Sequence, residues 1–393
     1  MAPSAPLSLR ALNRATLARQ GLLEPLSGPP GDAVRQLASL QAQHPEWPPV
    51  ALASRAADPR TADLAGALAG RTAVRSSLMR ITIHVVAADD LWPMFTVMQP
   101  MRADQWRRIL KRDPSDSELG RRLTSAHQIA IDALRERPRS SLELDRLLSG
   151  AVGLNEPAAT RPAWRRPESQ LVVRAAWRHF AAFVPLVHVP HDGEGYGRSK
   201  YALAADWLGV EPPQIDDVDA RIHVARRYLG AFGPATIQDL AAYVGRGKGG
   251  IGVWRKAIDR LAGEVVELRA EDGRALFDLT DAPRPPEGMP APPRLLARWD
   301  SLLLSHATRE RERVIAEAHR PRVFSKNADV LPTFLVDGFV AGTWQLDRTD
   351  GAAAITLRPF AKLGRKDAAA LEAEADRLLT LMGETSRTVR FAP

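Results

Sequence analysis

The sequence predicts an α+β protein made of three tandem winged-helix units and a smaller C-terminal α/β-barrel-like piece. The main observation is a repeated order of elements, since three helical segments and a strand-rich hairpin follow one another three times along the chain. The second observation is the proline-rich stretch 282–293, which cannot continue a helix or a central strand. The expected boundaries are therefore 1–115, 116–212, 213–286 and 287–393.

The first unit contains three helical segments before an alternating strand. We expect helices over about 8–20, 32–43 and 64–69, and a strand over 79–86. Gln41 and Gln43 then lie at the end of the second helix. Residues two apart do not share a face of a helix, but a helix end can open enough to aim both amides at one cavity. The alternative is that these amides only cap backbone groups.

The second and third units repeat this pattern. In the second, helices are expected near 125–135, 140–150 and 168–181, followed by a glycine-rich hairpin over 186–203. Ser140 or Ser141 is the expected N-cap of the middle helix. In the third, helices near 220–233, 235–245 and 252–263 precede a hairpin that turns at Asp272-Gly273. The last region combines strand-like segments at 295–306, 332–346 and 353–360 with a helix over 367–382, and we expect it to pack on the other units.

Charge indicates a phosphate-bearing partner. Lys and Arg outnumber Asp and Glu by 54 to 46, which gives a formal net charge of +8. An arginine-rich composition imposed by a GC-rich genome explains this charge equally well. A winged helix places its third helix in a DNA groove and its wing along the DNA backbone. Basic residues on the third helix and the wing are therefore candidate DNA contacts. The alternative is that they line a face exposed to solvent. In the second unit these candidates are Arg165, Arg166, Arg174, Arg178, Arg198 and Lys200.

A glycine-rich segment at 245–252 carries two more cations, Arg246 and Lys248. It lacks the GK[ST] sequence of a nucleotide-binding P-loop, so no nucleotide cofactor is expected. We expect the segment to contact DNA phosphates through backbone N–H groups and its two cations.

Several classes of chemistry are excluded by composition and motif. The chain has no cysteine, which removes disulfides, thiolate nucleophiles, iron–sulfur clusters and cysteine-ligated zinc. HExxH and GxSxG motifs are absent, and the nine histidines are scattered. No metal or other cofactor is therefore expected. The sequence shows no secretory signal and no apolar run long enough to cross a bilayer, so we expect a soluble cytoplasmic protein associated with the nucleoid.

Five segments in the same order resemble the AlkZ-type (AlkZ/YcaQ-like) DNA glycosylases over nearly the whole chain. They are LNRATLARQGL near the N-terminus, LQAQHP at 40–45, RITIHVVAADD at 80–90, WDSLLLSH at 299–306 and FLVDGFVAGTW at 334–344.

The resemblance implies a concave DNA-binding surface formed by the three units and a catalytic Gln-apolar-Gln motif. Gln41 and Gln43 match that motif, whereas a sister branch has aspartate in the second position. Arg80 and His84 match the family's Arg-x-Thr-x-His pattern and are candidates to face DNA, with hairpin packing and a surface ion pair as the alternative. Family members often accompany the biosynthesis of DNA-alkylating antibiotics, which implies a role in self-resistance.

The chemistry of two amides limits the substrate. An amide is not a strong base, so the leaving group must already be activated, as it is in a purine that carries a positive charge after alkylation at N7. Two amides can then orient a water molecule at the anomeric carbon and stabilise the developing positive charge. No lysine lies near the motif to form a Schiff base.

These residues predict a monomeric, monofunctional DNA glycosylase that acts on alkylated purines in double-stranded DNA, including bulky adducts and interstrand crosslinks. The alternative is a non-enzymatic winged-helix regulator, which commonly dimerises to match two half-sites.

Overall fold

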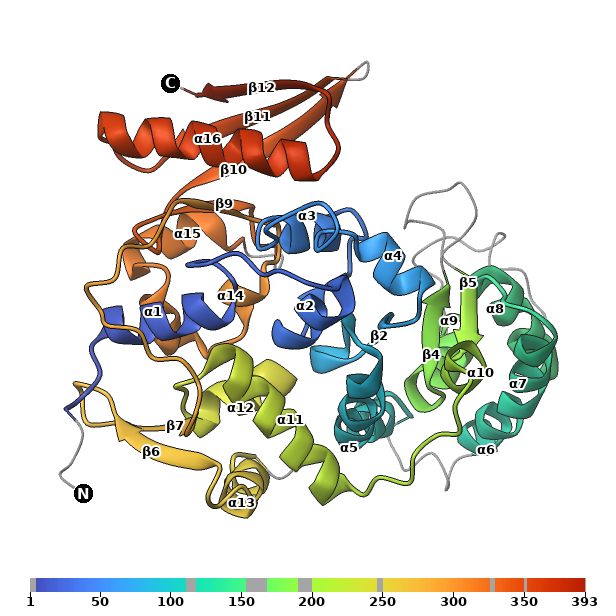
Figure 1. The fold of residues 1–393 in the computed structure, drawn as a ribbon. Helices are drawn as coiled ribbons and strands as arrows, with labels where there is room; N and C mark the ends of the chain where they lie inside the picture. Colours follow the sequence, from blue (N-terminus) through green and yellow to red (C-terminus); the bar gives the residue numbers. More distant parts are fainter. Residues whose placement is uncertain are drawn as a thin grey trace.

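The computed structural model describes residues 5–110, 118–152, 168–189, 200–245, 250–325, 329–349 and 352–392. The architecture is α+β, as expected. The C-terminal sheet and its helix lie at one end of the molecule, and the described residues 118–152, 168–189 and 200–208 form a lobe at one side (Figure 1). No helix within these ranges combines the length and apolarity needed to span a membrane.

The first unit differs from its prediction at the candidate motif. Its helices are α1 (Leu9–Arg19), α2 (Pro30–Gln36), α3 (Trp47–Ala53) and α4 (Leu64–Ala69), and its strands are β1 (Leu40–Gln41), β2 (Ala73–Ser77) and β3 (Ile83–Ala87). The helix expected over 32–43 was therefore wrong beyond Gln36. Ala38 has a φ of 60°, which a right-handed helix cannot include, and the chain continues in extended form into β1.

A long helix, α5 (Leu91–Leu110), leads from the first unit to the side lobe. The lobe contains α6 (Glu118–Ser125), α7 (His127–Glu136), α8 (Ser141–Ala151), α9 (Glu168–Phe183) and α10 (Ala204–Leu208), with the hairpin β4 (Leu186–Val189) and β5 (Lys200–Leu203). The expected cap is confirmed, because the Ser140 side chain accepts a hydrogen bond from the Glu143 N–H and Glu143 reciprocates at the Ser140 backbone.

The third unit has the expected order of elements. Helices α11 (Asp217–Phe232), α12 (Ile237–Val244) and α13 (Gly252–Arg260) precede the antiparallel strands β6 (Val265–Arg269) and β7 (Ala275–Leu279). Gly273, with a φ of 82°, occupies the turn that the Asp-Gly sequence predicts. Three helices and a two-stranded hairpin thus form the third unit, whereas the hairpin of the second unit follows four helices, α6 to α9.

The C-terminal region is a sheet covered by a helix. Its strands are β8 (Arg294–Leu296), β9 (Thr333–Val336), β10 (Phe339–Thr349), β11 (Ala352–Pro359) and β12 (Ser386–Phe391). Its helices are α14 (Ser301–Leu304), α15 (Arg320–Val323) and α16 (Arg365–Leu381), with short 3₁₀ turns at Thr308–Arg313 and Glu317–His319. The sheet order is β12-β11-β10-β9-β8. Because β8 and β12 form two edges, the described sheet is open, and the barrel-like closure that we expected is not present.

Two hydrophobic clusters join parts of the chain that are distant in sequence. One packs the first unit against the C-terminal sheet and α16, so that Val34 and Leu40 share a core with Phe334 and Leu371. The other packs β2 and α5 against α11, α12 and α13. Both clusters cross the expected unit boundaries, so the small sheet that carries the candidate motif is supported from two sides.

Candidate active site

Gln41 and Gln43 lie on an extended segment at one edge of the β1-β3-β2 sheet. Gln41 pairs with His84 across β1 and β3, and the next residue continues the pairing, since the Ala42 N–H donates to the Ile83 carbonyl at 2.8 Å. Successive side chains of an extended chain point to opposite faces. Ala42 is fully buried in the core, while Gln41 is half-buried and Gln43 exposed. The two amides therefore share one face, which a helix would not allow.

Hydrogen-bond donors fix which end of each amide faces the protein. The Gln41 Oε1 atom accepts long bonds from Arg80 Nη2 and Thr82 Oγ1, both at 3.4 Å. The Gln43 Oε1 atom accepts from the Ile83 N–H at 3.3 Å. A guanidinium group and a backbone N–H can only donate, so the atoms they meet must be amide oxygens. The Gln43 oxygen keeps one further lone-pair direction for a ligand or a water molecule, and the Gln41 oxygen keeps one when Thr82 Oγ1 gives its single hydrogen to the Met79 carbonyl, 3.1 Å away.

Arg80 occupies a tight turn that brings three elements together. Arg80 and Ile81 have φ values of 55° and 56°, in the left-handed region that a β-branched residue rarely adopts. The Arg80 guanidinium donates to the Tyr243 carbonyl on α12 as well as to Gln41, and it lies 3.2 Å from His84 Nε2. Burial lowers the pKa of Arg80, but a guanidinium keeps its charge in proteins. A positive charge is thus held beside the first amide.

His84 supports the Arg80 side chain from the buried side of the site. It is 0% exposed, so it does not reach the surface, and the expected contact with DNA has no exposed atom to make it. Its Nδ1 lies 3.1 Å from the Thr82 carbonyl, which must accept, so Nδ1 carries the proton and Nε2 accepts from Arg80. Burial and the Arg80 charge lower the pKa of His84 to about 3, which keeps the ring neutral.

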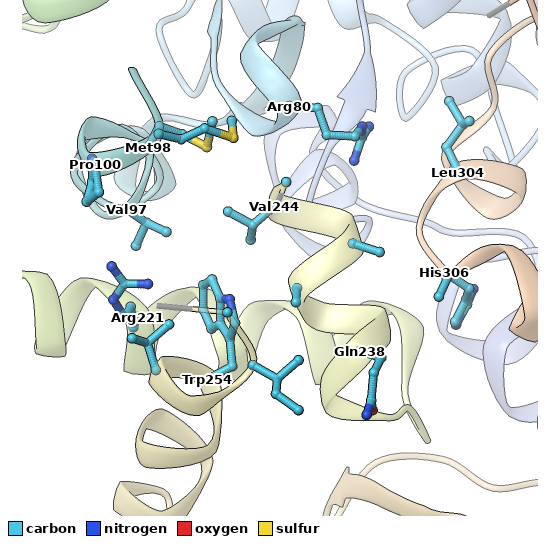
Figure 2. Close-up of a pocket in the computed structure, with 18 of the residues that line it drawn as sticks. Arg80, Val97, Met98, Pro100, Arg221, Gln238, Val244, Trp254, Leu304 and His306 are labelled. Carbon is cyan, nitrogen blue, oxygen red and sulfur yellow. The ribbon is translucent and has the colours of Figure 1, made fainter. Parts of the chain in front are cut away.

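Three hollows run along one side of this site. Gln43 lines the first, of about 400 Å³, which lies between α5 and α9. A second, of about 650 Å³, shares Ile81, Gln105 and Ile109 with the first. A third, of about 410 Å³, shares Arg80 and Met101 with the second. Figure 2 shows this third hollow, where Arg80 and Trp254 lie on either side of Val244. The hollows therefore form a continuous row from Gln43 to α13.

The basic residues expected to contact DNA fall into three groups. Arg178 is exposed on α9 and lines the first hollow together with Gln43. Lys200 is half-buried at the start of β5, and Arg174 lies on α9 at a position whose side chain is not described. The remaining candidates lie outside the described residues and are Arg165, Arg166, Arg198, Arg246 and Lys248.

Several residues of the site were not singled out from sequence. Arg75 donates from Nε and Nη2 to the Ala42 carbonyl, at 3.3 and 3.0 Å, and so holds the extended segment in place. Thr82 lies between the Arg80 turn and the start of β3, so the strand expected over 79–86 was wrong before Ile83, and the polarity of Thr82 is its only signal in the sequence. Tyr243 contributes a backbone carbonyl, which leaves no trace in sequence.

Known proteins share the sequence and the fold of this chain over most of its length. A sequence profile described as "DNA glycosylase AlkZ-like" matches residues 34–381. An interstrand DNA cross-link repair glycosylase of Streptomyces sahachiroi is 26% identical over 382 residues, which cover 94% of this chain and 95% of that protein. The solved structure of the Streptomyces sahachiroi DNA glycosylase AlkZ superposes with a TM-score of 0.76 at 24% identity, covering 98% of this chain and 100% of that one. This chain belongs to the AlkZ-like DNA glycosylase family.

Proposed function

We propose that this protein is a monofunctional DNA glycosylase that hydrolyses the N-glycosidic bond of N7-alkylated purines in double-stranded DNA. The observation that carries the proposal is the placement of Gln41 and Gln43 on one face of an extended segment, beside a row of hollows. The name of the Streptomyces sahachiroi relative extends the proposed substrates to interstrand crosslinks.

The bonding of the two amides favours a substrate that leaves without protonation. Arg80, Thr82 and Ile83 are the described partners of the amide oxygens, and none of them is a carboxylic acid. His84 is held neutral with its proton directed at a carbonyl, so it does not act as a general acid. A purine alkylated at N7 is already cationic and departs as a neutral base, so the site needs no acid.

The free lone pairs of the two oxygens supply the second part of the reaction. As the base leaves, the sugar develops positive charge at C1′, and a water molecule must attack that carbon. We assign the exposed Gln43 oxygen to hold a hydrogen of this water, and the Gln41 oxygen, fixed by Arg80, to hold its orientation while Thr82 donates to the Met79 carbonyl. The water loses its proton to solvent after attack, which leaves an abasic sugar and a free alkylated base.

A lysine-dependent lyase step is not part of the proposal. The first lysine of the chain is Lys111, seventy residues after Gln41, and Arg80 is the cation beside the amides. An arginine does not form the Schiff base that opens an abasic sugar. The DNA strand should therefore stay intact until it is heated in base.

The experiment is release of N7-methylguanine from a duplex that contains one such lesion. The purified protein should liberate the free base and leave an uncut abasic strand, and the Gln41→Ala, Gln43→Ala double variant should not. A winged-helix regulator without activity would leave the lesion in place, and full activity in the double variant would exclude the two amides as the catalytic groups.

A further inference from the structure

His44 directly follows Gln43 and stacks on an aromatic ring from the C-terminal region. Its imidazole lies face to face with the indole of Trp299, with ring centroids 4.4 Å apart and ring planes 13° from parallel. Aromatic pairs in such contact attract each other beyond the apolar area that they bury. The stack therefore joins the segment that carries both amides to a part of the chain that is distant in sequence.

The backbone pairing with β3 ends before Gln43. The bond from the Ala42 N–H to the Ile83 carbonyl is the last described backbone bond between this segment and β3. The Gln43 side chain has one described bond, from the Ile83 N–H at 3.3 Å. Pro45 disfavours a helical backbone at His44, which limits the directions in which the imidazole can point. The ring of His44 is thus the first side-chain anchor beyond Gln43.

Trp299 is held in a backbone conformation that a bulky residue rarely adopts. Its φ is 53°, in the left-handed region, and its N–H donates to the Val330 carbonyl at 3.1 Å. The next residue, Asp300, is buried and caps α14, so the backbone cannot relax on that side. The Arg298 guanidinium, bound to the Asp329 carboxylate, lies over the indole with Cζ 4.7 Å from the ring centroid. Strained residues that their surroundings hold in place cluster at functional sites, which favours a role for this ring beyond packing.

We infer that His44 is a positioning residue for the reaction and that it holds Gln43 in its catalytic orientation through the stack on Trp299. The inference rests on the proposed function and adds a residue to it. His44 does not touch the reacting atoms. Its ring anchors the backbone directly after Gln43, so that the Gln43 oxygen stays at the distance and angle needed to hold the attacking water.

The charge of His44 offers a different explanation for any effect of this residue. Its Nδ1 atom lies 3.6 Å from Glu46 Oε1, and the two side chains are 51% and 53% exposed. An exposed imidazole can also donate to a DNA phosphate. The stack needs only a flat ring at position 44, whereas a phosphate contact or an ion pair needs a ring nitrogen. The His44→Phe substitution separates the two, because it keeps the ring and removes both nitrogens.

The test measures the single-turnover rate of N7-methylguanine release from duplex DNA and, separately, the Kd for the undamaged duplex. We expect His44→Ala to lower the rate about tenfold without changing the Kd, because the amide is present but less well oriented. His44→Phe should recover most of the rate. His44 is exposed, so neither change should prevent folding. A wild-type rate in His44→Ala, or a His44→Phe variant as slow as His44→Ala, overturns the inference.

Double variants test whether His44 acts through Gln43 and Trp299. In a Gln43→Ala background, His44→Ala should cause no further loss, because no amide remains to be positioned. Trp299→Ala should slow release as much as His44→Ala does, and the two changes together should be no slower than either alone. A further tenfold loss in the Gln43→Ala background shows that His44 acts independently of the amide and overturns the inference, even if Trp299→Ala fails to fold.

Two control variants should keep the wild-type rate. His319 contacts Phe360 with ring centroids 4.8 Å apart, and among the described residues no hydrogen bond or ring contact joins it to residues 41–44, so His319→Ala removes a comparable ring from another place. Glu46→Gln removes the carboxylate beside His44 and leaves the stack. A slow Glu46→Gln variant assigns the effect to charge and contradicts the inference. Failure of the wild type to release the base overturns the proposed function itself.

Discussion

Arg55 and Asp300 form a buried two-bond ion pair between the first unit and the C-terminal region. Arg55 Nη2 lies 2.7 Å from Asp300 Oδ1 and Nη1 lies 3.0 Å from Oδ2, and the two residues are 1% and 2% exposed. Asp300 also caps α14 by accepting from the Leu302 N–H at 2.9 Å. Asp300 belongs to the family-like segment at 299–306, and its contacts assign it to the fold rather than to DNA.

Removing one partner of this pair should be costly, because it leaves the other charge buried and uncompensated. We expect Arg55→Ala to lower the free energy of unfolding by about 3–5 kcal/mol, measured by urea denaturation. Arg226→Ala is the control, since Arg226 and Glu264 form an exposed pair and their loss should have little effect. Equal urea midpoints for Arg55→Ala and Arg226→Ala would contradict a stabilising role of the Arg55–Asp300 pair.

Individual substitutions at the candidate motif should separate the two amides. We expect Gln43→Ala to lower the single-turnover rate of N7-methylguanine release about 10²-fold, the usual effect of removing one positioned polar group. Gln43→Asp should keep more activity, because a carboxylate oxygen can also accept a hydrogen from water. A Gln43→Asp variant no faster than Gln43→Ala would show that accepting this hydrogen is not the role of residue 43.

The geometry of the Gln41–Gln43 motif could not be predicted from the sequence. The chemistry of two amides could be predicted, but their geometry could not, because β1 is two residues long and exists only through pairing with β3, more than forty residues later. The apolar stripe before it is equally compatible with a longer helix. Elements with local signals were predicted well, such as α8 with its capping serine, and α16 with its regular apolar face. Segment 295–306 is predicted as a strand or a short strand-turn unit, yet after β8 it forms a turn and α14, because Asp300 caps a helix there.

His84 should act on catalysis and not on DNA affinity. Its buried ring accepts from Arg80, which in turn donates to Gln41, so His84→Ala should lower kcat about tenfold and leave the Kd for undamaged DNA unchanged. His84→Gln, whose side-chain oxygen can accept the same bond, should recover part of the rate. A change in Kd without a change in kcat would assign His84 to DNA binding after all.

Arg178, in contrast to His84, should act on DNA affinity and not on catalysis. It is exposed on α9 and borders the hollow that contains Gln43. We expect Arg178→Ala to weaken binding to undamaged duplex and to reduce the slope of log K against log salt concentration by about one, as the loss of one phosphate contact does. Arg226→Ala, which removes an exposed arginine of the third unit already paired with Glu264, should leave the slope at its wild-type value.

Acid should destabilise the protein through its buried histidines. Burial lowers the pKa of His84, His179 and His306 to about 3, and all three are at most 2% exposed. In the unfolded chain the same rings take up a proton below about pH 6.5, so the unfolded state binds more protons and stability falls as the pH decreases from 6.5 toward the folded pKa values. The slope should approach about 1.4 kcal/mol per pH unit for each such ring. Thermal melts between pH 7.5 and 5 measure this loss of stability. The His179→Phe substitution should reduce the loss, because a phenylalanine ring can keep the packing of His179 against Trp106 and Phe183 but does not titrate. A melting temperature that is constant over this range would mean that these rings are not held neutral in the fold.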